Sequence, residues 1–88
     1  MATASGTVTI EVRVELKSGV MDAEAESIEK SLRLLGISDL AEVRTARVYV
    51  LTFEGIDAPE AQRRAHRAVD QLLANPVIHR VELALRPE

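Results

Sequence analysis

The chain has no cysteine and no tryptophan, and it carries one tyrosine and one phenylalanine among 88 residues. Without cysteine it cannot form a disulfide, a thiolate metal site or a cysteine nucleophile. With so few aromatic side chains, its apolar content of 47% comes mostly from Ala, Val and Leu, which give little bulk for a deep core. A domain of this length buries a small share of its surface, so we expect it to gain stability by oligomerisation.

The chain also lacks an excess of basic charge and a long hydrophobic run. Its formal net charge is -3, which disfavours a nucleic-acid partner because such partners are bound through a basic surface. No stretch approaches the roughly 20 apolar residues that span a membrane. The opening MATASGT has neither a basic start nor an apolar run of signal-peptide length. We therefore expect a cytoplasmic protein that binds neither nucleic acid nor membrane.

Two segments near the ends of the chain alternate between apolar and polar residues, as strands with one buried face do. The first extends from Thr7 to Leu16, and the last begins near Arg80. We therefore predict two half-buried strands, one toward each end of the domain.

Two helices are predicted between these strands. Asp22 and Asp57 can each cap a helix N-terminus, because a carboxylate accepts hydrogen bonds from free backbone N–H groups. The first helix is expected to end at Gly36. The second should end at Asn75, which tolerates the left-handed conformation, with Pro76 blocking any continuation. The predicted buried stripes comprise Ala25, Ile28, Leu32 and Leu35 in the first helix, and Ala61, Ala65, Ala68, Val69 and Leu72 in the second.

A further strand, over residues 42–54, is apolar on both faces in its second half. Val48 and Val50 make one face apolar, while Arg47 lies among apolar residues on the other face. A charged side chain is not accommodated in a dry core, so we expect a bend or bulge around Ala46 and Arg47. The second apolar face needs a cover, and another copy of the chain is the simplest one. Val48 and Val50 are therefore candidate interface residues in a homo-oligomer.

These elements predict a single α+β domain over residues 7–88, preceded by a flexible tail over residues 1–6. The expected order is β-α-β-α-β, with a three-stranded antiparallel sheet whose middle strand along the chain is long and bent. Both helices are expected on one face of this sheet, which gives the domain a ferredoxin-like character.

No group of reactive side chains stands out in the sequence. His66 and His79 have no matched carboxylate spacing, and the acidic residues around Asp22 fit a helix N-terminus better than carboxylate catalysis. We therefore expect no catalytic, metal-binding or cofactor-binding residue in this chain. A basic group on the second helix is either a solvated face or a docking patch for an acidic partner: Arg63, Arg64 and Arg67.

Three stretches resemble the PurS family, the small subunit of phosphoribosylformylglycinamidine (FGAM) synthase in purine biosynthesis. They are LKSGVMDAEAESIEKSLRLLG, VRTARVYVLTFEG and LLANPVIHRVEL, and they cover nearly all of residues 8–85 in the order and spacing of the family. The chain departs from the family where Ala23 replaces a frequent proline and where Ala46-Arg47 replaces a frequent Gly-Lys. The resemblance marks five positions as structural or partner-contacting: Lys17, Asp22, Arg47, Asn75 and Pro76.

The resemblance implies a non-catalytic subunit. In FGAM synthase systems a glutaminase subunit, PurQ, releases ammonia, and a synthetase subunit, PurL, uses ATP and magnesium to activate formylglycinamide ribonucleotide (FGAR). PurS-like subunits dimerise and bridge the two enzymes, so this chain is expected to form a dimer or a tetramer. The implied partners are therefore further copies of this chain, PurL and PurQ, and the implied cofactors belong to PurL. The alternative is a regulatory domain of the ACT type that senses an amino acid, for which Gly19 is the only cue.

Overall fold

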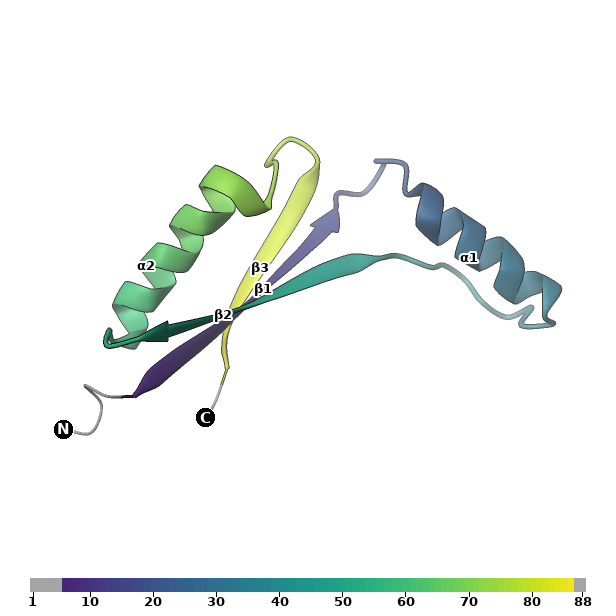
Figure 1. The fold of residues 1–88 in the computed structure, drawn as a ribbon. Helices are drawn as coiled ribbons and strands as arrows, with labels where there is room; N and C mark the ends of the chain where they lie inside the picture. Colours follow the sequence, from purple (N-terminus) through teal and green to yellow (C-terminus); the bar gives the residue numbers. More distant parts are fainter. Residues whose placement is uncertain (1–5, 87–88) are drawn as a thin grey trace.

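The computed structural model describes residues 6–86, which form one antiparallel sheet and two helices. The sheet order is β2-β1-β3, so β1 is the central strand (Figure 1). The predicted α+β class and element order are confirmed. The predicted tail, residues 1–6, lies outside the described residues apart from Gly6. In chain order the elements are β1 (Thr7–Leu16), α1 (Ala23–Leu34), β2 (Ala46–Glu54), α2 (Ala58–Ala68), the short π-helix η2 (Val69–Leu73) and β3 (His79–Arg86).

The core lies between the sheet and α2. Ile10 and Val12 of β1 are fully buried, because β2 and β3 pair with both edges of the strand and α2 covers one of its faces. From the helix, Ala61 and Ala65 are also fully buried. Their small side chains fit a helix packed close against a sheet, and this contact explains why the second predicted stripe is rich in alanine.

Both helices begin where the capping residues predict. The Oδ1 atom of Asp22 accepts a hydrogen bond from the backbone N–H of Ala25 at 2.9 Å, and Asp57 does the same for Glu60 at 3.0 Å. Just beyond α1, Gly36 has a φ of +95°, a conformation that glycine adopts without a steric penalty. Local sequence therefore determines where both helices begin.

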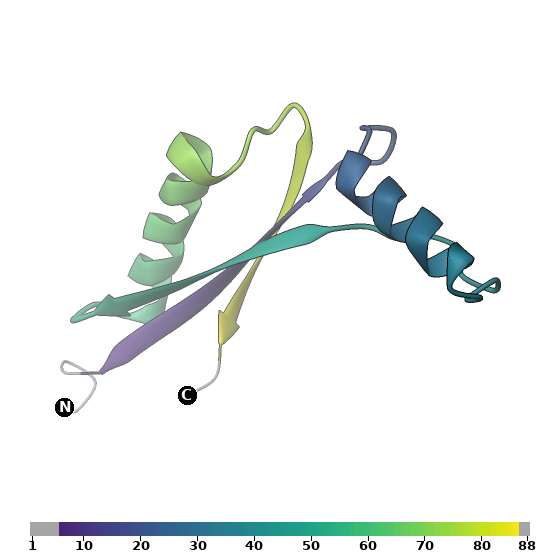
Figure 2. The ribbon, with the colours of Figure 1, turned by 45° about the vertical axis from the view of Figure 1, so that its right-hand side comes forward.

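The expectation that both helices lie on one face of the sheet is wrong for α1. Only α2 packs on the sheet, whereas α1 extends beyond the end of β1 and β2, as two views of the ribbon show (Figures 1 and 2). Of its predicted buried stripe, Ala25 is buried, but Ile28 and Leu35 are 39% and 77% exposed. The two connections carry α1 past the sheet, so Ile28 and Leu35 of its apolar stripe stay exposed among the described residues.

The predicted bulge in the middle strand is absent. β2 begins at Ala46, and its pairing with β1 is regular from Glu15 opposite Ala46 to Thr7 opposite Glu54. Residues 42–45 precede the strand and do not belong to it. Arg47 needs no bulge, because it lies near the end of the sheet, where its side chain is exposed to solvent.

The connection between α2 and β3 is built by hydrogen bonds of Asn75 and His79. The side-chain Oδ1 of Asn75 accepts from the N–H of Val77 at 2.9 Å, and Nδ1 of His79 accepts from the N–H of Asn75 at 2.9 Å. The left-handed conformation predicted for Asn75 is wrong, since every residue with positive φ in the described part of the chain is a glycine. Instead, η2 ends the helix and Ala74 is extended. Asn75 therefore acts through its side chain, as an Asx turn.

Asn75→Ala should lower the free energy of unfolding by about 1 kcal/mol, as expected when a side-chain cap of backbone N–H groups is lost. Thermal unfolding followed by circular dichroism measures the change. Asn75→Asp is the matched control, because it keeps an oxygen acceptor at the same position. A melting temperature that is unchanged in the alanine variant would contradict this role of the side chain.

Candidate functional site

The sheet face that α2 leaves uncovered carries a buried carboxylate surrounded by arginines. Glu15 of β1 is only 6% exposed. It accepts hydrogen bonds from Nε of Arg13 at 3.0 Å and from Nη2 of Arg80 at 2.6 Å, and it also pairs with Arg44. The arginines come from β1, β3 and the segment before β2. These four residues are called the Glu15 cluster below.

The Glu15 cluster is electrostatically unbalanced. The hydrogen bond from Arg13, together with the charges of Arg44 and Arg80, lowers the pKa of Glu15 against the opposing effect of burial. One carboxylate faces three guanidinium groups, so two positive charges of the cluster remain uncompensated within it. The arginine side chains are 52–58% exposed, and each has more N–H donors than Glu15 can accept. The cluster can therefore bind an anionic group from outside the chain.

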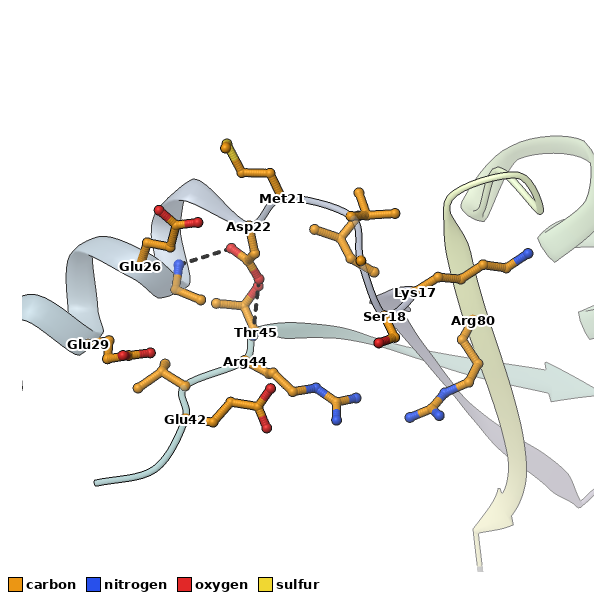
Figure 3. A pocket seen from close by; sticks show the side chains of 15 residues that line it. Lys17, Ser18, Met21, Asp22, Glu26, Glu29, Glu42, Arg44, Thr45 and Arg80 are labelled. Atoms are coloured by element: carbon orange, nitrogen blue, oxygen red, sulfur yellow. Dashed lines mark hydrogen bonds between the residues drawn. The ribbon is translucent and has the colours of Figure 1, made fainter. Parts of the chain in front are cut away.

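Beside this cluster lies a cavity of about 290 Å³, at the junction between α1 and the sheet. Figure 3 shows the guanidinium groups of Arg44 and Arg80 turned toward one another, with Glu26 and Glu29 projecting from α1 on the other side. Lys17 adds a third cation to the lining, and Asp22 and Glu42 bring its carboxylates to four. The cavity is therefore bipolar, with a basic wall toward the sheet and an acidic wall toward α1.

Asp22 joins the two sides of this cavity. Besides capping α1, its carboxylate accepts a hydrogen bond at 2.7 Å from the hydroxyl of Thr45, just before β2. The N–H of Ala25 and the Thr45 hydroxyl lower the pKa of Asp22. The sequence predicted the cap but not Thr45, because a partner 23 residues away leaves no local signal.

The positions marked by the family resemblance gather at one end of the sheet. Lys17 and Asp22 line the cavity, and the backbone N–H of Lys17 donates to the carbonyl of Ile78 at 2.8 Å, next to the turn of Asn75 and Pro76. Arg47 lies apart from the Glu15 cluster, since its register partner is Val14, on the face that α2 covers.

The candidate interface residues lie on the uncovered face of the sheet. Val48 and Val50 of β2 are 48% and 50% exposed, and their register partners on β1 are Arg13 and Glu11. The valines thus form an apolar strip along the edge strand, next to the Glu15 cluster. Their role in an interface stays a prediction.

The basic patch predicted on α2 is partly neutralised within its own helix. Nε of Arg63 donates to Oε1 of Glu60 at 3.0 Å, and Nε of Arg64 donates to Oε2 at 3.1 Å. These bonds lower the pKa of Glu60. Of the three arginines, only Arg67 makes no ion pair within residues 6–86, so the patch presents less net charge than the sequence suggested.

The two histidines come together without forming a metal centre. His66, His79 and Asp70 line a second cavity, of about 300 Å³, between α2 and β3. Within residues 6–86, however, no group of three or more His, Cys, Asp or Glu side chains could hold a metal ion. The helices in this part of the chain are also too short and too polar to cross a membrane.

Glu15→Gln should reduce the free energy of unfolding at neutral pH and make it less dependent on pH. Because the folded-state pKa of Glu15 is lowered, its ionisation stabilises the fold above the usual glutamate pKa of about 4.3, and this stabilisation is lost as the pH falls through the folded value. The difference between variant and wild type should therefore shrink below about pH 4. Urea unfolding at several pH values measures it.

The control is Glu82→Gln, on the same face of the sheet, because Glu82 makes no ion pair within the described residues. An equal deficit of Glu15→Gln at neutral and acidic pH would show that its charge is not responsible.

Comparison with known proteins identifies the family. The family model for PurS, described as phosphoribosylformylglycinamidine (FGAM) synthase, matches residues 9–87. The PurS subunit of this synthase from Archaeoglobus fulgidus is 40% identical over 76 residues, which cover 86% of this chain and 95% of the relative. The corresponding subunit from Methanocaldococcus jannaschii is 33% identical over 72 residues, 82% of this chain and 87% of that subunit.

Solved structures agree with this assignment. The crystal structure of PurS from Methanocaldococcus jannaschii has a TM-score of 0.79 at 28% identity and covers 90% of this chain and 95% of its own. A chain in the structure of PurLQS from Thermotoga maritima has a TM-score of 0.83 at 25% identity and covers 92% of this chain and 99% of its own. These matches give no support to the ACT alternative. With the family model matched over almost the whole sequence, the chain belongs to the PurS family of FGAM synthase subunits.

Proposed function

We propose that this chain is a non-catalytic subunit of an FGAM synthase assembly, in which it bridges a PurL synthetase and a PurQ glutaminase. The observation that carries the proposal is the match to PurS over residues 9–87. A structural neighbour that belongs to a PurLQS assembly supports the choice of partners. The proposed setting is the cytoplasm, where the glutamine and ATP that such a reaction consumes are available.

In this role the chain contributes surface and no reactive side chain. A bridge raises the effective concentration of one active site near the other, and it shields ammonia from loss to solvent between the sites. The proposal places ATP and magnesium in the synthetase and assigns no cofactor to this chain. Charged surfaces such as the Glu15 cluster and Arg67 are suited to docking, since complementary charge speeds association and fixes orientation.

The proposed assembly also contains further copies of this chain. Its core is one sheet covered by one helix, with a half-exposed apolar strip of Val48 and Val50 on the opposite face. α1 adds more uncovered apolar surface, including Leu35 at 77% exposure. Such surfaces are typical of a subunit whose core is completed by association.

The direct test is FGAM synthesis by the cognate PurL and PurQ, with and without this chain. Adding the chain should restore the glutamine-dependent rate and leave the ammonia-dependent rate unchanged, because free ammonia needs no coupling between the sites. Product formation measured with each nitrogen source distinguishes the two. If the chain changes neither rate, the bridging function is refuted.

Val50→Glu should dissociate the oligomer, because it places an unpaired charge in an apolar contact. Multi-angle light scattering measures the mass, and circular dichroism confirms that the fold is retained. Val77→Glu is the control, since Val77 is 77% exposed in the turn before β3. If Val50→Glu keeps the wild-type mass, the strip of Val48 and Val50 is not an interface.

A further inference from the structure

The bipolar cavity between α1 and the sheet has a basic wall with unused hydrogen-bond donors. Arg44 and Arg80 both donate to the same oxygen atom of Glu15, Oε1. A guanidinium group has five N–H donors, so each arginine keeps several that no acceptor within residues 6–86 takes. Figure 3 shows the two guanidinium groups facing one another. Together they offer a set of converging donors to one anionic group.

The charge of this wall suits a phosphate group. The single negative charge of Glu15 is shared among the three arginines of its cluster. Lys17 lines the same cavity and makes no ion pair within the described residues. A phosphate monoester carries a charge of about −1.5 to −2 at neutral pH and has three acceptor oxygens. Arginine binds such a group through two parallel N–H···O bonds, so a phosphate can neutralise the excess charge and occupy several of the free donors.

The acidic wall determines what else the ligand must carry. Of its four carboxylates, Asp22 is occupied by the cap and by Thr45, and Glu29 pairs with Arg33 at 2.9 Å. The carboxylates of Glu26 and Glu42 make no ion pair within residues 6–86. An ionised carboxylate only accepts hydrogen bonds and repels a second anion. The part of the ligand that faces α1 must therefore be uncharged and present hydroxyl or N–H donors.

The size of the cavity restricts the ligand further. Its volume of about 290 Å³ is at the lower end of the range for small-molecule sites, about 300–1,000 Å³. No group of carboxylates or histidines in the described chain could hold a metal ion, so the acidic wall has no cation of that kind to bind. A sugar phosphate meets these conditions, because it has one phosphate at one end and hydroxyl groups along the rest of a short molecule.

We propose that this cavity binds a small hydroxylated organic phosphate, with its phosphate on Arg44 and Arg80 and its hydroxyl groups on Glu26 and Glu42. The ligand is either a free sugar phosphate or the sugar-phosphate part of a nucleotide, since both present the same chemistry. The inference goes beyond the bridging function, which assigns no ligand to this chain, and does not depend on it. A ligand bound to both walls would also join α1 to the sheet.

Titration of the full chain with ribose 5-phosphate tests the site, with binding followed by the NMR amide signals of Gly19 and Thr45, which line the cavity. We expect saturable shifts with ribose 5-phosphate, several-fold weaker binding of inorganic phosphate, and none of ribose. Adenosine monophosphate distinguishes the two sources, because it binds only if the cavity accepts a nucleotide. If neither organic phosphate shifts these signals, or if inorganic phosphate binds as tightly, the proposal is overturned.

Arg44→Gln tests the basic wall. It should raise the Kd of ribose 5-phosphate about tenfold, as expected for the loss of a hydrogen bond between charged groups. The matched control is Arg86→Gln, because Arg86 also pairs with a glutamate of β1, Glu11, but does not line the cavity. Circular dichroism checks that each variant is folded, and Arg80→Gln replaces Arg44→Gln if the latter is not. Equal Kd values for the cavity variant and the control refute the site.

Glu42→Ala tests the acidic wall, because it should affect two ligands in opposite directions. Ribose 5-phosphate should bind more weakly, since a hydroxyl group loses its acceptor. Inorganic phosphate should bind equally or more tightly, since one repelling charge is removed. Glu82→Ala is the control, with the same change in charge outside the cavity. If Glu42→Ala changes the Kd of both ligands by the same factor, the carboxylates do not select the hydroxyl groups and the proposal is refuted.

Discussion

The burial of β1 is the constraint on which the rest of the molecule depends. Ile10 and Val12 reach zero exposure only because β2 and β3 pair with both edges of this strand and α2 covers one face. This sheet and helix form the only buried apolar cluster in the described residues. A core of this size leaves the opposite face of the sheet and the stripe of α1 uncovered, so the surfaces available for assembly follow directly from the small size of the core.

The Glu15 cluster has a different role from that of the core. A nearly buried carboxylate is tolerated in a protein only when charged or polar partners satisfy it. Here the three arginines that do so come from three separate parts of the chain, so the cluster ties together the end of the sheet from which α1 departs. Asp22 and Thr45 form a second tie at the same place. The direction of α1 is therefore fixed by polar contacts, while its apolar stripe stays available.

Local features of this fold could be predicted from the sequence, and long-range ones could not. Asp22 and Asp57 cap the helices as predicted, because capping depends on neighbouring residues. The predicted position of α1 on the sheet was wrong for a physical reason. An apolar stripe indicates that a helix has a face suited to burial, but it does not indicate whether its own chain covers that face. The Glu15 cluster escaped notice because Arg44 and Arg80 lie 29 and 65 residues from Glu15. The resemblance to PurS marked five positions of the sequence, but only the structure shows that most of them lie at one end of the sheet.

The flatness of the molecule limits how it can handle a small diffusing intermediate. The Cα atoms of the described residues extend over 56 × 28 × 14 Å, which in the thinnest direction is about one sheet and one helix. A slab of this thickness cannot enclose a tunnel along its length, and the centre that it does have is filled by Ile10 and Val12. Any sheltered route for ammonia must therefore run over the outside of this subunit, with one wall from its surface and the other from a neighbouring protein.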